Sequence, residues 1–484
     1  MPLDRVLNLL GTEQALLQSQ RRRQAAVWRG EKLDYLPLLL AGGSISERKF
    51  FPSDTKALSD AESSVASQGL SQNNVNHLPE MILERDKEQR VLRSKATQTM
   101  SDAVTAQKRP GPSGSPIFKV LRRCSSAMCH RHKAFVAPCT DFKSGTPNSQ
   151  PYFETAPYNL KEQFFDKEKM LYEQTWAVLS TVRAGGDALP SLRANLGTGF
   201  LASVFGLEEE VFEDKMPWLK KHLRKDEIKK LSIESLNPIS EKGLIPRAKE
   251  YMNFFKKRLN GKASVYLSDT QGPFDLAHLI RGDEIFTDFY DDPGFVRHLM
   301  ELSTYVYIEA TKYLKRVIDE PLNAGYHSNS LYMEGCGVRC CEDTTTLLSP
   351  EIVKEFVVPY IKKALSPFEG GWVHFCGKGN HLLDIFLEIP EVKGINFGNP
   401  ENYDPAEILP KLESKGKVYY GSFPRKEKEG TEEYFARLLK PLHKKGTLLL
   451  VFNLPEGEGS PSVLSLWHSV QDKMFGRNDS QRKI

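Results

Sequence analysis

The chain has 484 residues, enough for two or three ordinary domains or one large one, and its 66 lysines and arginines nearly balance 62 aspartates and glutamates. The formal net charge of +4 gives no reason to expect nucleic acid as a partner. No apolar run approaches the roughly 20 residues that span a bilayer, the first residues do not read as a signal peptide, and seven cysteines in no disulfide-rich pattern fit reduced thiols, so we expect a cytoplasmic protein without a membrane partner.

Residues 1–43 are predicted to form an amphipathic helix followed by a first strand at Tyr35–Ala41. The composition changes over residues 44–151, where Ser, Asn, Gln, Lys and Arg dominate and hydrophobic periodicity disappears. Such a segment cannot bury enough apolar surface to offset the entropy of ordering it. We therefore interpret 44–151 as a long, polar, disordered insertion directly after the first strand.

From residue 152 to 484, strand-like runs alternate with helical patterns. Seven further strands are predicted: Ala188–Arg193, Ala263–Ser268, the Cys336–Cys341 region, a run that ends at Cys376, Val392–Phe397, Val418–Ser422 and Thr447–Phe452. Strands that alternate with helices form right-handed βαβ units and a parallel sheet. Eight such units favour an α/β fold of the closed (β/α)₈ TIM-barrel type. An open, doubly wound sheet is the alternative, although no G-x-G-x-x-G turn supports a dinucleotide site in it.

The fifth strand ends in a pair of potential metal ligands, His374 and Cys376. Residues i and i+2 of a strand point to the same face, so the imidazole and the thiol would lie side by side. Both are good zinc ligands, and the carboxyl ends of strands are where α/β folds place their chemistry. Taken alone, the pair is equally compatible with a buried core histidine beside an inert cysteine.

The preceding strand carries a dense group of further candidates, Cys340, Cys341, Glu342 and Asp343. Alternation puts Cys340 and Glu342 on one face and Cys341 and Asp343 on the other, so at most one pair faces His374 directly. Carboxylates after a strand are also common helix-capping residues. The presence of thiols and acids next to the H-x-C pair favours a functional site here.

Two residues near the same rim are weaker candidates for binding a cofactor. Lys378 lies in a glycine-rich turn that could hold an anionic group, and Asn396 ends the sixth strand facing the predicted barrel mouth. Ordinary turn formation explains either residue as well.

Several segments together resemble the uroporphyrinogen decarboxylase superfamily. The matching motifs are R-A-N-L-G-T-G-F from Arg193, Q-G-P-F-D-L-A from Gln271, L-S-P-E-I-V-K-E-F-V-V-P-Y from Leu348, and H-F-C-G from His374. The resemblance covers residues 1–43 and about 152 to the end. It implies a (β/α)₈ barrel and an enzyme, because the superfamily contains the decarboxylase of haem synthesis and zinc-dependent methyltransferases that move methyl groups between corrinoids and thiols.

The decarboxylase branch of this family carries an arginine-rich motif after the first strand, which is absent here. Its active-site tyrosine, serine and late histidine align near His278, Asp343 and Asn453, so all three positions depart from its pattern. An octacarboxylate substrate also needs several arginines, for which Arg193, Arg339 and Arg425 are the obvious candidates. Decarboxylation of a porphyrinogen therefore remains the alternative function.

The methyltransferase branch implies zinc bound by His374 and Cys376. The further cysteine of that branch aligns near Asn453, where this chain has no thiol, so Cys340, Cys341 or Glu342 would complete the site. The resemblance thus predicts zinc-assisted methyl transfer between a corrinoid and a thiol.

The residues predicted to take part fall into three groups. Asp343, His278 and Glu342 are predicted to be catalytic, Arg193, Lys378 and Asn396 to bind a cofactor, and His374, Cys376, Cys340 and Cys341 to bind metal. The expected partners are a small methyl donor and acceptor or a tetrapyrrole, with a separate corrinoid protein and a homodimer left open. A corrinoid- or tetrapyrrole-binding protein without catalysis is the remaining alternative.

Overall fold

The computed structural model describes residues 2–10, 14–41, 158–455 and 459–476. The described residues belong to one compact unit, and the predicted insertion 44–151 lies outside them.

Eight short strands form the wall of a barrel, and each lies within or overlaps one of the eight predicted strands. They are β1 (Leu38–Ala41), β2 (Ser191–Arg193), β5 (Ser264–Tyr266), β8 (Val338–Cys341), β9 (Gly371–Phe375), β10 (Val392–Phe397), β11 (Val418–Gly421) and β12 (Leu448–Asn453). Six of them pair in parallel in the order β1-β12-β11-β10-β9-β8, and β2 pairs in parallel with β5. Single bridges join the two groups, from Leu39 to Gly186 and from Gln271 to Cys341. The predicted (β/α)₈ barrel is confirmed.

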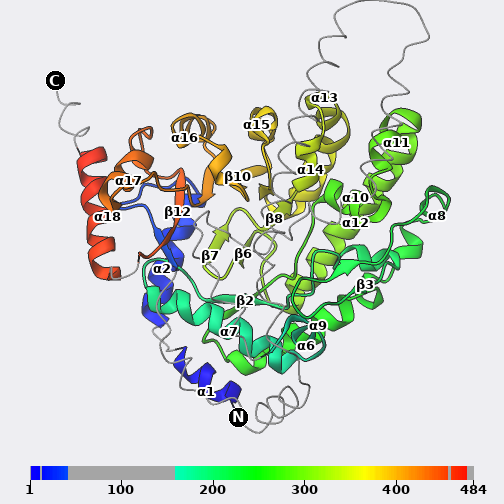
Figure 1. The fold of residues 1–484 in the computed structure, drawn as a ribbon, viewed down its shortest axis with the longest axis horizontal. Coiled ribbons are helices and arrows are strands. Elements are labelled where there is room, and N and C mark those ends of the chain that lie inside the picture. The colour runs from blue at the N-terminus through cyan, green and yellow to red at the C-terminus, as the bar shows by residue number, and fades with distance from the viewer. Residues whose placement is uncertain (1, 11–13, 42–157, 456–458, 477–484) are drawn as a thin grey trace, which may run out of the picture. The chain divides into compact units, whose positions relative to one another are not determined.

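Helices surround this ring (Figure 1). They are α1 (Pro2–Leu9), α2 (Gln14–Trp28), α6 (Leu160–Phe165), α7 (Lys167–Ala184), α8 (Lys225–Ile228), α9 (Ile245–Leu259), α10 (Pro273–Arg281), α11 (Ile285–Asp291), α12 (Pro293–Val317), α13 (Pro350–Ile352), α14 (Val358–Leu365), α15 (Asn380–Leu387), α16 (Pro405–Ser414), α17 (Thr431–Leu439) and α18 (Ser460–Phe475). Aspartate side chains cap several of them, as Asp166 does for α7 and Asp292 for α12. The predicted single N-terminal helix is in fact two helices, α1 and α2. None of the described helices is both long and apolar enough to cross a membrane.

A small antiparallel hairpin, which the sequence did not predict, occupies the interior of the barrel. Its strands β6 (Ala324–His327) and β7 (Leu331–Glu334) lie in the middle of the ring (Figure 1). At its tip, Asn329 Oδ1 accepts a hydrogen bond of 3.0 Å from the hydroxyl of Tyr266 on β5. The ring of His327 packs against Tyr266 and Trp372, with centroids 5.2 and 5.1 Å apart. Since the hairpin precedes β8 in the chain, it enters from the amino ends of the strands and fills the barrel below the mouth.

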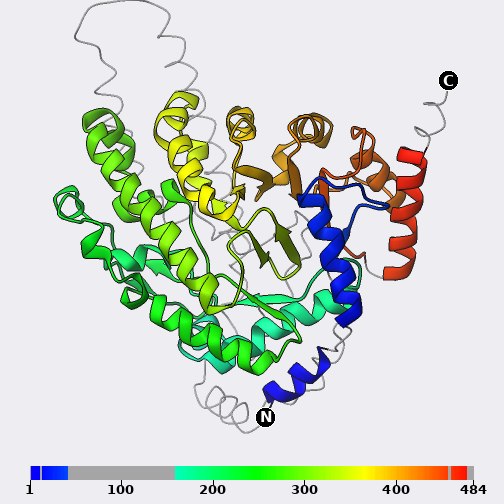
Figure 2. The same cartoon turned by 180° about the vertical axis from the view of Figure 1, so that it is seen from behind.

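Helix α2 holds this hairpin in place (Figure 2). The fully buried Gln24 donates to the carbonyl oxygens of Asp187 and Ser330 at 2.6 and 3.0 Å, and it accepts from the backbone N–H of Tyr332 at 2.7 Å. Trp28 Nε1 donates to the carbonyl oxygen of Tyr332 at 3.0 Å. The segment before the insertion is therefore an integral part of the barrel.

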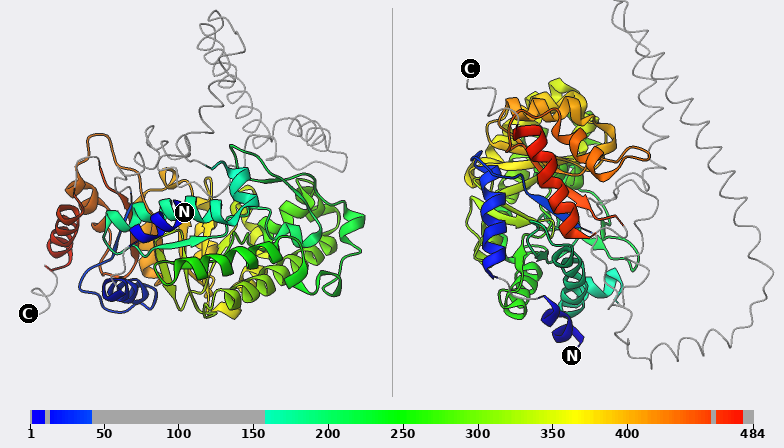
Figure 3. Two further views of the ribbon diagram at one scale, coloured as in Figure 1. Left: turned by 90° about the horizontal axis from the view of Figure 1, so that it is seen from below. Right: turned by 90° about the vertical axis from the view of Figure 1, so that its left-hand side faces the viewer.

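The C-terminal helix completes the wall beside β1. Helix α18 packs next to α17 (Figure 3). Its buried Trp467 lies 4.8 Å from Phe435 of α17, measured between ring centroids, and its indole N–H donates to the carbonyl oxygen of Leu36 at 2.7 Å. The last described helix thus contacts the segment that leads into β1.

Candidate metal site

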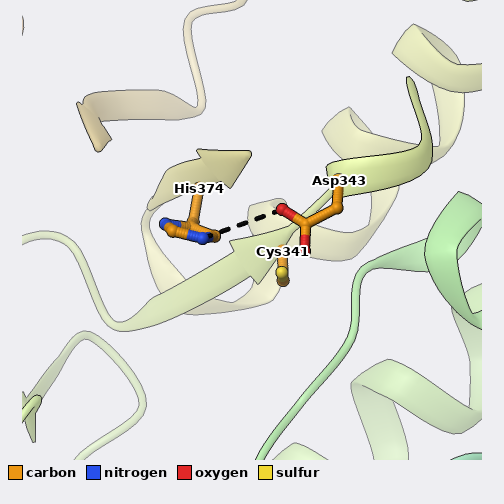
Figure 4. A group of neighbouring side chains, drawn as sticks. All are labelled: Cys341, Asp343 and His374. Atoms are coloured by element: carbon orange, nitrogen blue, oxygen red, sulfur yellow. Dashed lines mark ion pairs between the residues drawn. The ribbon is translucent and has the colours of Figure 1, made fainter. Parts of the chain in front are cut away.

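Strands β8 and β9 bring a thiol, a carboxylate and an imidazole together at their carboxyl ends (Figure 4). The strands pair in parallel with Cys341 opposite His374, and Asp343 follows β8 two residues later. One ligand atom from each of these three residues lies within 4.8 Å of the other two. His374 Nε2 and Asp343 Oδ1 are 3.7 Å apart. The sequence did not decide which face of β8 lies next to His374. The structure shows that it is the face bearing Cys341 and Asp343.

A hydrogen bond to Asn396 fixes the orientation of the His374 ring. Its Nδ1 shares a short hydrogen bond with Asn396 Oδ1, and Asn396 Nδ2 donates to the carbonyl oxygen of Tyr420 at 2.6 Å. Asn396 lies opposite His374 in the β9–β10 register, which explains the contact. With Nδ1 occupied, Nε2 is the ring nitrogen directed at Asp343. A second hydrogen-bond partner of this kind is the usual companion of a metal-binding histidine. Asn396, predicted to bind a cofactor, is therefore a direct support of His374.

Cys376 lies at the edge of the same cluster. Its Sγ is 3.5 Å from His374 Nε2, and its backbone N–H donates to Asp343 Oδ1 at 2.6 Å. Burial lowers the pKa of His374, but the hydrogen bond with Cys376 and the charge of Asp343 outweigh that effect, so the pKa is raised overall. The predicted H-x-C pair thus adjoins Cys341 and Asp343, giving a set of two thiols, one imidazole and one carboxylate.

Cys340 and Glu342 lie on the other face of β8. Both are fully buried, and the Cys340 thiol is 3.8 Å from Glu342 Oε1. Glu342 accepts hydrogen bonds from the backbone N–H groups of Phe274 and Asp275, at the start of α10. Burial, together with neighbouring acidic groups, raises the pKa of the Cys340 thiol and of the Glu342 carboxyl well above their usual ranges. The structure does not bring these two predicted site residues to the His374 side of the strand.

Two other predicted residues lie near the rim. His278 of α10 uses Nε2 to contact Asp283 Oδ1 at 3.0 Å, and its Nδ1 is 3.4 Å from Thr344 Oγ1. It therefore adjoins the loop after β8 rather than the ligand atoms of the cluster. Lys378 is exposed in the turn that follows β9.

A buried group of charges lies on the inner face of the barrel. Arg339 precedes Cys341 by two residues on β8 and therefore shares its face. Its guanidinium donates to Asp269 Oδ1 at 2.8 Å, while Arg193 Nη1 is 3.6 Å from Asp269 Oδ2. The three side chains are 4, 9 and 0% exposed for Arg339, Arg193 and Asp269. Two guanidinium groups share one carboxylate, so this group carries one excess positive charge.

That excess charge acts on the nearby hairpin. Burial and the charges of Arg339 and Arg193 hold the pKa of His327 well below its usual range, which favours the neutral imidazole. The position of Arg193, predicted as a binding residue, suits an anionic group of a ligand. Sequence reasoning missed His327, because no pattern marked the hairpin that carries it.

Another carboxyl group with buried oxygens lies beside the loop that follows β2. Glu209 belongs to a small hairpin of β3 (Glu209–Glu210) and β4 (Trp218–Leu219). Its Oε1 lies so close to Gly199 that a Cβ there would come within 2.4 Å. Burial raises the pKa of Glu209 to about 8. The close approach of this side chain thus requires glycine at position 199, the second glycine of the G-T-G motif.

This raised pKa predicts a specific dependence of stability on pH. Between the ordinary pKa of 4.5 and about 8, the folded state keeps a proton on Glu209 that the unfolded state has lost. The free energy of unfolding should therefore fall as pH rises through this window. Glu209→Gln should remove this fall in stability, because glutamine does not ionise. Above pH 8 the variant should be more stable than the unsubstituted protein by on the order of 3 kcal/mol, and at pH 4.5 it should not be more stable.

Urea unfolding at pH 5 and pH 9 measures this difference. Glu208→Gln is the matched control, because Glu208 is the exposed neighbour that pairs with Lys220. Equal effects of Glu209→Gln at the two pH values would contradict the assignment.

Comparison with a model of a known protein family agrees with these motifs. Residues 197–418 match the family model for uroporphyrinogen decarboxylase (URO-D), a range that includes Cys341, Asp343, His374 and Cys376. This match confirms the resemblance to the superfamily over these residues. A methyltransferase from Methanosarcina mazei is a solved structure with a TM-score of 0.48 and 12% sequence identity, over 66% of this chain and 90% of that one. No curated protein matches the chain in sequence.

Proposed function

We propose that the protein is a URO-D superfamily enzyme that transfers a methyl group between a corrinoid and a thiol at a zinc site. The observation that carries this proposal is the convergence of Cys341, Asp343 and His374 within 4.8 Å at the carboxyl ends of β8 and β9. Cys376 would add a second thiol. Sulfur, nitrogen and carboxylate oxygen are the donors that zinc takes in proteins, and the support of His374 by Asn396 fits a metal ligand. A thiol substrate bound to zinc in this set would be held as its thiolate at neutral pH.

This arrangement would explain how the site can bind zinc without a cysteine near Asn453. In the family pattern the further cysteine stands at the end of the eighth strand, which here is the exposed Asn453 of β12. We propose that Cys341 of β8 takes the place of that cysteine. The chain's other groups then have separate tasks: Asn396 orients His374, and the pair Arg193 and Arg339 holds an anionic part of a substrate.

One observation favours a second candidate function. The excess positive charge of the Arg193, Arg339 and Asp269 group suits a carboxylated substrate, as decarboxylation of a porphyrinogen requires. That reaction would need no zinc, so the two candidates differ in what metal removal does.

Metal analysis combined with a transfer assay tests the proposal. We expect the purified protein to contain about one zinc per chain, as a single ligand set implies. It should convert methylcobalamin and a small thiol to the thioether, cob(I)alamin and a proton. This activity should be lost on dialysis against a chelator and regained with added zinc. Absence of zinc, together with metal-independent release of CO₂ from a porphyrinogen, would favour the second candidate. Binding of cobalamin without turnover would indicate a binding protein.

A further inference from the structure

We propose that Asp275 and Glu342 are positioning residues, a crossed pair of carboxylates that ties the start of α10 to the loop after β8 and so directs Asp343 toward His374. The inference rests on the proposed function, because Asp343 needs a fixed direction only if it is a ligand. Neither residue reaches the ligand atoms, and each acts through the backbone of the other's element.

Glu342 forms one half of the crossed pair. It lies at the end of β8, and its Oε1 and Oε2 accept the backbone N–H groups of Phe274 and Asp275 at 3.3 and 3.2 Å. These N–H groups belong to the first turn of α10, where no helical carbonyl is available to accept them. Glu342 therefore attaches this nine-residue helix to β8.

Asp275 forms the other half, in the opposite direction. Its Oδ2 accepts the backbone N–H of Asp343 at 2.8 Å, and its Oδ1 accepts that of Thr344 at 2.7 Å. The backbone that carries the Asp343 side chain is thus held at two successive amides. From this position, Asp343 Oδ1 accepts the N–H of Cys376 and lies 3.7 Å from His374 Nε2.

The close approach of the two elements depends on Gly272. Its N–H donates to the carbonyl oxygen of Cys341 at 2.7 Å. A Cβ at this position would come within 2.5 Å of Glu342 Oε1 and 2.7 Å of Cys340 Sγ. Any side chain here would push α10 away from β8 and lengthen all four hydrogen bonds of the crossed pair.

Simple helix capping does not account for two carboxylates here. A serine or asparagine caps a helix without burying a charge, whereas Asp275 and Glu342 are 4 and 0% exposed and adjacent to a third acid, Asp343. Each of these side chains, however, accepts one N–H group on each of its two carboxyl oxygens, whereas an amide has a donor NH₂ in place of the second oxygen. Both residues use this capacity, so the geometry points to fixation of the loop as their shared role.

Cobalt binding separates positioning from stability. Apo protein would be titrated with Co²⁺ and its visible absorption bands recorded, for the unsubstituted chain and for Asp275→Asn and Glu342→Gln. Each variant keeps the size of the side chain but loses one acceptor. We expect both to bind Co²⁺ about 10–100-fold more weakly, the usual cost of losing a group behind a ligand, with altered absorption bands. Asp275→Glu, which keeps both acceptors, should recover part of the affinity.

The control is Asp292→Asn. Asp292 also accepts a backbone N–H at a helix start, from Phe295 at 3.0 Å on α12, but it lies outside the cluster. It should leave the affinity and the spectrum unchanged. If the unsubstituted protein binds no Co²⁺, the proposed metal site is wrong. If it binds Co²⁺ and both variants match it, the crossed pair does not position Asp343. Unfolding of both variants would also overturn the inference, since it would assign the pair to stability alone.

Discussion

Replacement of His374 by alanine is expected to remove tightly bound zinc and, with it, methyl transfer. The affinity for zinc should fall by at least about 100-fold, because loss of a group behind a ligand already costs about 10–100-fold and His374 supplies a ligand itself. His374 is the residue on which the site converges: its Nε2 lies 3.5 Å from Cys376 Sγ and 3.7 Å from Asp343 Oδ1. Elemental analysis of the purified variant and a competition titration with a zinc indicator measure the effect.

His381→Ala is the matched control for this prediction. His381 lies on α15, where its Nε2 contacts the carbonyl oxygen of Leu348 at 3.1 Å, so its removal should leave the zinc content unchanged. Circular dichroism of both variants establishes that the barrel is intact. A His374→Ala protein that retains a full equivalent of zinc would show that the metal binds elsewhere.

Replacement of Asp269 by alanine is expected to produce the largest loss of stability, about 3–5 kcal/mol in the free energy of unfolding. The carboxylate is completely buried and shared by Arg193 and Arg339, which are themselves nearly buried. Without it, two guanidinium groups in the barrel interior lose the carboxylate that they share, and the cost of their desolvation is no longer offset by it. Urea unfolding at pH 7 measures the change.

Asp384→Ala provides the comparison, because Asp384 pairs with Lys411 at the surface, with side chains 72 and 46% exposed. That change should cost less than about 1 kcal/mol. Added acetate should raise the stability of Asp269→Ala by more than that of Asp384→Ala, since the small carboxylate can take the place of the missing side chain. A loss below 1 kcal/mol for Asp269→Ala would mean that the arginines relax to water.

The sequence predicted the barrel well because its signal is local. Each strand is a short apolar run that ends near a turn or a helix start, and alternation with helices is visible along the chain. The β6–β7 hairpin was missed for the same reason: Ala324–His327 and Leu331–Glu334 are short and partly polar, and their burial comes from α2 and from aromatic side chains distant in the sequence. The split of the N-terminal helix into α1 and α2 was likewise missed.

The sequence by itself determined the chemical types at the site and their pairing along each strand. His374 with Cys376, and Cys341 with Asp343, follow from the two-residue period of a strand, which needs no knowledge of the fold. Only the tertiary structure decided which face of β8 lies next to His374 and Cys376. The register that sets Cys341 opposite His374 depends on how the parallel strands align in the closed barrel, and a shift of one residue would have presented Cys340 and Glu342 instead. The excess charge of Arg193 and Arg339 and the crossed pair of Asp275 and Glu342 have the same origin, since each joins residues about 70 or more positions apart that meet only when the barrel closes.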